Sequence, residues 1–495
     1  MTIRPVRRFG LSKSRITAFE QCPRRLWLMI HNPAAAEQDA GAEARFATGH
    51  SVGDLACALL PGGVMIEAEP DLGAALTRTA ALVAARGPEP LFEATFQHDG
   101  VLVRADILIP EGRKGWRMAE VKSSTGPKDY HLGDLATQVW VMEEAGLTLA
   151  GAAIRHIETG FVLEREGDYA GLFADAELLG EARGIARHRP EVVAEARAML
   201  AADEPVRDMG DHCTSPFACE FAAWCAKGQP QGPDWPVTIL PYGGGKKWLA
   251  QGIDDLLALD EAALSGKHAR MLAATRDDRP FHDGPGARAA MTDWGHPRAF
   301  LDFETINPAI PRWIGTRPYQ QVPFQFSLHL ESADGAMTHH EFLCADGSDP
   351  RGRCAEALVA AIPPEATVIA YNAAFEKRVL RELARDVPDL AAPLLAMEAR
   401  TVDLLPVARE HWYHRDQRGS WSIKAVLPTL SALGYEGLEV KDGGGAQDAW
   451  LEAVDPACAP DRRWALEEQL KAYCALDTLA MVAVLRGLAG EGPGA

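Results

Sequence analysis

Two acidic residues, Asp302 and Glu304, stand inside the otherwise apolar run AFLDFETI. A short apolar run of this kind predicts a buried β-strand. Side chains on a strand alternate between its two faces, so both carboxylates would point to the same side. Two carboxylates held this close repel each other unless a cation lies between them. The run therefore predicts a divalent-metal site, although a strand with two solvated acids would explain this pattern alone.

Two later segments carry polar side chains that could complete such a metal site. The apolar run TVIAY ends at Asn372, and the helix predicted after it carries Glu376 in its first turn. Near the end of the chain, Tyr473 and Asp477 are four residues apart on a predicted helix and therefore face the same way. Taken singly, Glu376 fits an exposed position on an amphipathic helix, and Y-x-x-x-D is a weak pattern. The ordered set of three segments is more specific.

Together these segments resemble the DnaQ-like exonuclease family, in the subclass with Tyr in the third motif, over about residues 298–487. The family pattern is D-x-E, then N-x-x-x-D, then Y-x-x-x-D, and here Glu376 replaces the Asp of the second motif. The resemblance implies a ribonuclease-H-like fold, removal of nucleotides from 3′ ends, and two Mg²⁺ or Mn²⁺ ions about 3.5–4 Å apart. The implied metal ligands are Asp302, Glu304, Glu376 and Asp477, with Tyr473 positioning a water or helping to deprotonate it.

Two more residues are candidate nucleic-acid contacts in this C-terminal region. Asn372 belongs to the second motif, and Lys424 lies in GSWSIKAVLPTL, which predicts a capped helix. Lys424 could face the substrate backbone, whereas the serines of this segment fit a structural helix start.

The first part of the chain carries a second arrangement of acids. Asp106 lies in VRADILI, and Glu120 and Lys122 lie in AEVKSS, two predicted strands joined by a loop. Alternation places Glu120 and Lys122 on one face. The acids would hold a cation, and the lysine would stabilise the charge on an attacked phosphate or orient the attacking water. An exposed hairpin with ordinary charges is the alternative.

This arrangement resembles the RecB-like nucleases of the PD-(D/E)XK superfamily, over about residues 10–226, and implies a restriction-endonuclease-like fold. By the same resemblance, His50 in ATGHSVG completes the metal set of Asp106 and Glu120, and Gln138 touches the substrate. The family often has an aromatic residue four positions after that glutamine, where this chain has Met142.

Four cysteines bracket this nuclease-like region: Cys22, Cys213, Cys219 and Cys225. Cysteines at regular spacing in a cytosolic chain indicate a metal or cluster site. An iron–sulfur cluster is favoured over Zn²⁺, for which His212 could replace one ligand. Cysteines placed this way resemble the iron–sulfur nucleases of CRISPR adaptation and of AddB-type recombination enzymes. The resemblance implies a [4Fe-4S] cluster that ties the two chain ends together and takes no part in hydrolysis.

Composition breaks divide the chain into domains of mixed α/β class. Segments rich in Pro and Gly at 226–247 and 276–297 flank a stretch with helical spacing. We therefore expect a restriction-endonuclease-like domain at 1–228, a linker with a small helical connector at 229–297, and a ribonuclease-H-like domain at 298–490.

The net charge of −19 argues against an electrostatic grip on nucleic acid along the whole chain. The first 25 residues are basic, however, and this arm, which includes Arg4, Arg7, Arg8 and Lys13, is either a solvated tail or a phosphate contact. No uninterrupted apolar stretch approaches the roughly 18 residues of a membrane span, and the start does not read as a secretion signal. A cytoplasmic protein without membrane contact is expected.

The sequence thus predicts a metal-dependent nuclease with two separate active sites. DNA is favoured over RNA as its substrate, and repair, recombination and antiphage defence are all compatible roles, with or without protein partners. One alternative keeps a single active site and uses the other half to grip nucleic acid. Another is a non-catalytic adaptor in a larger nucleic-acid complex.

Overall fold

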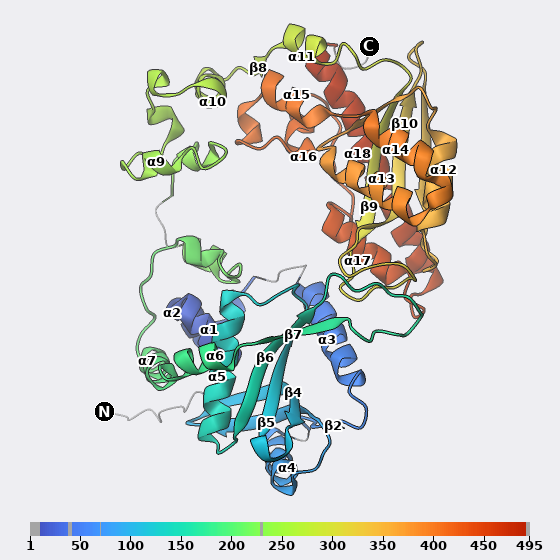
Figure 1. Ribbon diagram of the computed structural model, residues 1–495. Coiled ribbons are helices and arrows are strands. Elements are labelled where there is room, and N and C mark those ends of the chain that lie inside the picture. The colour runs from blue at the N-terminus through green and yellow to red at the C-terminus, as the bar shows by residue number, and fades with distance from the viewer. Residues whose placement is uncertain (1–9, 38–41, 70, 228–230, 492–495) are drawn as a thin grey trace. The chain divides into compact units, whose positions relative to one another are not determined.

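The computed structural model describes residues 10–37, 42–69, 71–227 and 231–491 and divides into two compact units (Figure 1). Unit 1 consists of Met1–Pro230 and Pro308–Tyr319, and unit 2 of Gln231–Asn307 and Gln320–Ala495. Each unit combines a sheet with helices, so the predicted mixed α/β class is confirmed. The basic residues Arg4, Arg7 and Arg8 lie outside the described residues.

Unit 1 is built on one seven-stranded sheet with the order β2-β3-β4-β5-β6-β7, to which β1 adds by pairing with β4. Its strands are β1 (Leu11–Ser12), β2 (Val64–Met65), β3 (Leu91–His98), β4 (Val101–Pro110), β5 (Trp116–Lys122), β6 (Leu149–Ile157) and β7 (Phe173–Glu177). Its helices are α1 (Lys13–Gln21), α2 (Pro23–His31), α3 (Ala42–Ala58), α4 (Leu72–Ala85), α5 (Asp129–Glu144), α6 (Leu179–Ala186), α7 (Arg189–Ala201) and α8 (Ala222–Ala226).

The core of unit 1 forms where α5 covers the sheet. Inward positions along β4, such as Val103 and Ala105, are fully or almost fully buried, and they alternate with half-buried ones, the two-residue period expected of a strand. Helix α5 packs against β3, β4 and β6, and α1 packs against α2 and α5. This packing brings the start of α1 next to the strands that carry the predicted acids.

Unit 2 is built on a five-stranded sheet with the order β11-β10-β9-β12-β13. Its strands are β9 (Arg298–Ile306), β10 (Val322–Glu331), β11 (Met337–Leu343), β12 (Thr367–Ala370) and β13 (Thr401–Asp403), and a separate pair joins β8 (Phe281–His282) to β14 (Trp412–Tyr413). The first long strand, β9, lies in the middle, antiparallel to β10 and parallel to β12. The predicted strand at 298–306 is therefore confirmed and central.

Helices pack on both faces of this sheet. The helices of unit 2 are α9 (Lys246–Leu249), α10 (Gly266–Asp277), α11 (Gly284–Ala290), α12 (Arg351–Ala361), α13 (Ala374–Asp386), α14 (Ala391–Ala399), α15 (Leu404–His411), α16 (Ile423–Val426), α17 (Gly443–Ala453) and α18 (Pro460–Ala489), of which α10 packs on the β8–β14 pair. On β9, Leu301 and Phe303 join a core with α12, α13 and α14, whereas Phe300 joins a core with α15 and α18. Asp302 and Glu304 share the parity of Phe300, so they lie on the α18 side.

Helix α18 is long and apolar enough to cross a membrane by length and composition, but most of its apolar stretch is buried within the unit. It packs against β9 and β10, as a core helix does.

The region 248–272 is less helical than its spacing predicts. Only α10 is a helix of regular length there, and the preceding residues form short 3₁₀ turns. The side chains of Asp255 and Asp260 accept hydrogen bonds from the backbone N–H groups of Leu257 and Ala262, at 2.9 and 3.0 Å. Asp bonded in this way to the backbone two residues on favours a turn over a continuing helix.

Candidate metal centres

Three of the predicted acids of unit 2 lie on the α18 side of β9, and the charge of the fourth, Glu376, acts on Asp302 and Glu304. Asp302 and Glu304 project from the central strand, Asp477 from α18, and Glu376 from the first turn of α13, just past the end of β12. Glu304, Glu376 and Asp477 are 6%, 3% and 8% exposed, although all are carboxylic acids. Three separate elements thus bury a group of acids in one place.

Burial and mutual repulsion raise the pKa values of these carboxyl groups and so favour their neutral, protonated forms. Burial raises the pKa of Asp302 well above its ordinary value, and the negative charges of Asp477, Glu304 and Glu376 raise it further. Burial also raises the pKa of Glu304 and of Glu376, each to about 8. Among the described residues, no arginine forms an ion pair with any of the four acids. The charge of Lys424 lowers the pKa of Glu304 and of Asp477, but both pKa values remain above their ordinary values.

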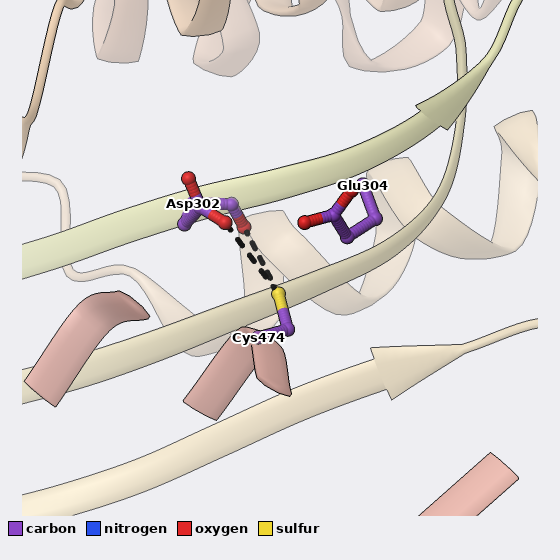
Figure 2. A group of neighbouring side chains, drawn as sticks. All are labelled: Asp302, Glu304 and Cys474. Carbon is purple, nitrogen blue, oxygen red and sulfur yellow. Dashed lines mark hydrogen bonds between the residues drawn. The ribbon is translucent and has the colours of Figure 1, made fainter. Parts of the chain in front are cut away.

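A thiol also belongs to this group. Figure 2 shows Cys474 of α18 directed at Asp302, and donor atoms of Asp302, Glu304 and Cys474 all lie within 4.8 Å of one another. The Cys474 sulfur is 3.7 Å from Oδ2 of Asp302 and 3.9 Å from its backbone oxygen. The sequence prediction passed over Cys474, because a cysteine between Tyr473 and Asp477 has no distinctive spacing.

Two tyrosines and a lysine line the same acids. The Tyr435 hydroxyl donates to Oδ1 of Asp477 at 2.5 Å. The Lys424 ammonium lies 5.2 Å from the ring centre of Tyr435 and 5.0 Å from that of Tyr473, and it donates to the Tyr473 hydroxyl at 3.2 Å. Tyr473 and Lys424 were predicted site residues, whereas Tyr435, distant in sequence from every motif, was missed.

Asn372, a predicted nucleic-acid contact, lies between β12 and α13. Its backbone φ is +68°, a strained conformation for a residue other than glycine, and its N–H donates to Oδ1 of Asp403 at 2.9 Å. The exposed side chain is left open to solvent. Asp403 ends β13 and contributes its charge to the raised pKa of Glu376, so it is a further acid that the motifs did not indicate.

These residues fit divalent cations such as Mg²⁺ or Mn²⁺. Hard oxygen ligands are what such ions prefer, and a cation would remove the repulsion that raises the carboxyl pKa values. One buried oxygen of Glu376, Oε2, has no hydrogen-bond partner among the described residues, which is costly unless another group satisfies it. Asp302, Glu304, Glu376 and Asp477 would be the ligands.

The buried acids make the stability of the metal-free protein depend on pH. Glu304 and Glu376 stay protonated in the folded state up to a pKa of about 8, but in the unfolded chain they ionise above about 4.5. Unfolding therefore releases protons between these values, and the free energy of unfolding falls as the pH rises. Glu304→Gln should flatten this fall by up to about 1.4 kcal/mol per pH unit.

Urea unfolding of the metal-free protein at pH 5.5, 6.5 and 7.5 measures this slope. Glu365→Gln is the matched control, because Glu365 is an exposed acid of the same unit. Equal slopes for Glu304→Gln and the wild type would contradict the burial of an ionisable group at this position.

Unit 1 holds its acids in a charge-balanced arrangement. Oε1 of Glu120 accepts from the Lys122 ammonium at 2.8 Å and also from Lys13, and Oε2 accepts from Gln138 at 2.6 Å. Burial would raise the pKa of Glu120, but the two ammonium groups lower it below its ordinary value. Asp106 accepts from the backbone N–H of Val121 at 2.7 Å.

The structure places Gln138 and His50 in positions other than those that the resemblance implies. Gln138 is completely buried behind Glu120, so it orients that carboxylate and is closed off from a substrate. His50 lies on α3 and is exposed, and within the described residues it forms no hydrogen bond or ion pair with Asp106 or Glu120.

The four predicted cysteines line one pocket of unit 1, together with Arg24, Arg25, Arg207 and His212. Gln21, at the end of α1, donates to the backbone oxygens of His212 and Phe217 at 2.8 and 2.7 Å, which fastens the cysteine-rich loop to α1. Among the described residues, no three of the cysteine sulfurs lie within 4.8 Å of one another. A single tetrahedral zinc would bring them to about 3.8 Å, given Zn–S bonds of about 2.3 Å.

The comparisons with known proteins match parts of the chain. Residues 299–422 match a family described as a domain of unknown function, DUF2779. A curated relative, the "Uncharacterized protein MG366 homolog" of Mycoplasma pneumoniae, is 25% identical over 234 residues, which are 43% of this chain and 35% of the relative. The chain thus spans about a third of that relative's length. No solved structure matches the chain.

The matched family segment contains part of the acid group. Asp302, Glu304 and Glu376 fall within 299–422, whereas Tyr473 and Asp477 fall after it. Neither the four cysteines nor the acids of unit 1 are covered by that match.

Proposed function

We propose that this chain is a metal-dependent nuclease with two separate active sites, one in each unit. The observation that carries the proposal is the group of Asp302, Glu304, Glu376 and Asp477 at a central strand, of which all but the half-buried Asp302 are buried. Grouping acids in a buried place destabilises a protein through desolvation and mutual repulsion, and bound divalent cations would remove that repulsion. The strand order of unit 2, with β9 central and β10 antiparallel to it, is the order expected of a ribonuclease-H-like fold.

In unit 2 the bound cations would activate water and stabilise a leaving oxygen. The side chains act around them. The four carboxylates fix the cation positions, and the Lys424 ammonium supplies a positive charge for the substrate phosphate. The Tyr473 hydroxyl, held by Lys424, would position the attacking water. Tyr435 orients Asp477 through its short hydrogen bond. Removal of nucleotides from 3′ ends is the proposed activity, as the resemblance to DnaQ-like exonucleases implies.

In unit 1 the proposed ligands are Asp106 and Glu120, and Lys122 would contact the phosphate under attack. Lys122 is placed for this by Glu120 and by Asp134, whose Oδ2 is 3.4 Å from the ammonium. The four cysteines that line one pocket are the proposed ligands of an iron–sulfur cluster, with zinc as the alternative, and DNA is the proposed substrate.

Degradation of end-labelled DNA and RNA, single- and double-stranded, in Mg²⁺ or Mn²⁺ tests the proposal on protein purified without oxygen. We expect degradation by the wild type, partial degradation by Asp302→Asn or Glu120→Gln alone, and none by the double variant. Degradation by the double variant at the wild-type rate would refute both site assignments.

A further inference from the structure

Lys13, a residue of the basic N-terminal arm, reaches the acids of unit 1. Its ammonium forms an ion pair with Oε1 of Glu120, the same oxygen that Lys122 contacts at 2.8 Å. The side chain of Lys13 is only 25% exposed. The pairing of β1 with β4, in which Ser12 is opposite Leu102, fixes the residue before Lys13 beside the strand that carries Asp106.

Helix α1 makes a second contact with the same group. Thr17, one turn after Lys13, donates to Oδ1 of Asp134 at 2.7 Å, and Asp134 is the acid that also holds Lys122. Residues four apart on a helix share a face, so α1 presents Lys13 and Thr17 together to the site. Such a lysine is part of the site and is not a solvated tail.

The two lysines differ in how firmly they are held. Lys122 contacts both Glu120 and Asp134, whereas Lys13 hydrogen-bonds to Glu120 alone among the described residues. A divalent cation at Glu120 needs Oε1 or Oε2; Oε1 already accepts from two ammonium groups, and Oε2 accepts from Gln138 and keeps a lone pair. A cation bound at this carboxylate is repelled by both ammonium groups at close range, and Lys13 moves away more easily because it has fewer bonds to lose.

We propose that Lys13 is a phosphate-binding residue of the unit 1 site, which holds Glu120 until a divalent cation binds and then contacts a substrate phosphate. The inference rests on the proposed nuclease function of unit 1. An ammonium released beside a cation site lies where an anionic phosphodiester would enter, and charge attraction directs it there. Lys13 therefore competes with the cation for Glu120 and strengthens the binding of the substrate.

Two opposite changes should follow in Lys13→Ala. We expect the half-saturating Mg²⁺ concentration to fall about threefold, because a competitor has gone. We expect KM for a DNA oligonucleotide to rise about tenfold, the effect of one lost contact worth about 1.4 kcal/mol, with a smaller change in kcat. Lys13→Arg keeps the charge and should keep KM within twofold of the wild type.

The assays use the full chain carrying Asp302→Asn, so that cleavage reports on unit 1. Lys114→Ala is the matched control, because Lys114 is an exposed lysine of the same unit. Binding of a fluorescent oligonucleotide in Ca²⁺ gives a readout that does not need turnover, and circular dichroism checks folding. If Lys13→Ala does not fold, Lys13→Gln is measured in its place.

The outcomes separate this inference from the proposed function. If Glu120→Gln leaves cleavage unchanged in this background, or if no cleavage occurs at all, the proposed function of unit 1 fails. If Glu120→Gln abolishes cleavage but Lys13→Ala changes neither oligonucleotide binding nor the Mg²⁺ requirement, the role of Lys13 is refuted. A loss of kcat with KM unchanged also refutes it, because a phosphate contact acts on binding.

Discussion

Asp302→Asn should lower the proposed 3′-end exonuclease activity of unit 2 by roughly 100- to 1,000-fold, the range seen when one preorganised electrostatic group is removed. Asp302 lies on the central strand, and the charges of Asp477, Glu304 and Glu376 all act on it. Asn has nearly the same shape but carries no charge, so it keeps the packing and removes a metal ligand. The loss should therefore appear in activity and in Mn²⁺ affinity, and not in folding.

Three measurements check this expectation. Digestion of a 5′-labelled single strand is followed in a Glu120→Gln background, Mn²⁺ binding is followed by titration calorimetry, and thermal unfolding is recorded without metal. Asp461→Asn is the matched control, because Asp461 is an exposed acid on α18, the helix that also carries Asp477. The metal-free Asp302→Asn protein should be at least as stable as the wild type, since Asn cannot ionise beside the neighbouring acids. Unchanged Mn²⁺ binding would exclude Asp302 as a ligand.

Cys22→Ser should abolish binding of the proposed iron–sulfur cluster and destabilise unit 1. Cys22 lies between α1 and α2, and the other three cysteines lie about 190 residues later. A cross-link that closes a loop of this length is worth about 5 kcal/mol in the chain-entropy account. The same loss would loosen α1, which carries Lys13 and Thr17 to the unit 1 acids.

Iron and sulfide content, visible absorbance, and the thermal unfolding of unit 1 measure this effect on protein purified without oxygen. Cys458→Ser provides the control, because Cys458 lies in unit 2 and is absent from the cysteine pocket. A wild-type protein that contains zinc and no iron would rule out the cluster. Iron retained at wild-type content in Cys22→Ser would rule out Cys22 as a ligand.

Local sequence patterns were sufficient to predict the secondary structure and facing direction of Asp302, Glu304 and Asp477. The apolar run around Asp302 and Glu304 predicts a strand. Because side chains on a strand alternate between its two faces, these two acids are also predicted to share one face. The four-residue spacing of Tyr473 and Asp477 similarly predicts one helix face. Each of these predictions uses residues that are neighbours in sequence, so no knowledge of the tertiary fold is needed.

The contacts that were missed are made by long-range packing. Tyr435 reaches Asp477 from 42 positions away, and Lys13 reaches Glu120 from 107 positions away. Neither has a sequence spacing that could indicate its partner. Gln138 is a different case: the resemblance identified its neighbourhood, but the burial of α5 turns its side chain to Glu120 and away from solvent.

The segment Pro308–Tyr319 has a practical consequence for anyone dividing this chain. It belongs to unit 1, where Ala309 is buried among Val52, Ile157 and Leu172, yet it follows β9 of unit 2 directly. A cut near residue 230 therefore would not yield two self-contained fragments. The C-terminal fragment would expose apolar side chains of this segment and tend to aggregate, and the N-terminal fragment would lack part of its own core. Activity assays on separate halves would understate both sites, so point variants of the full chain are the sound way to assign them.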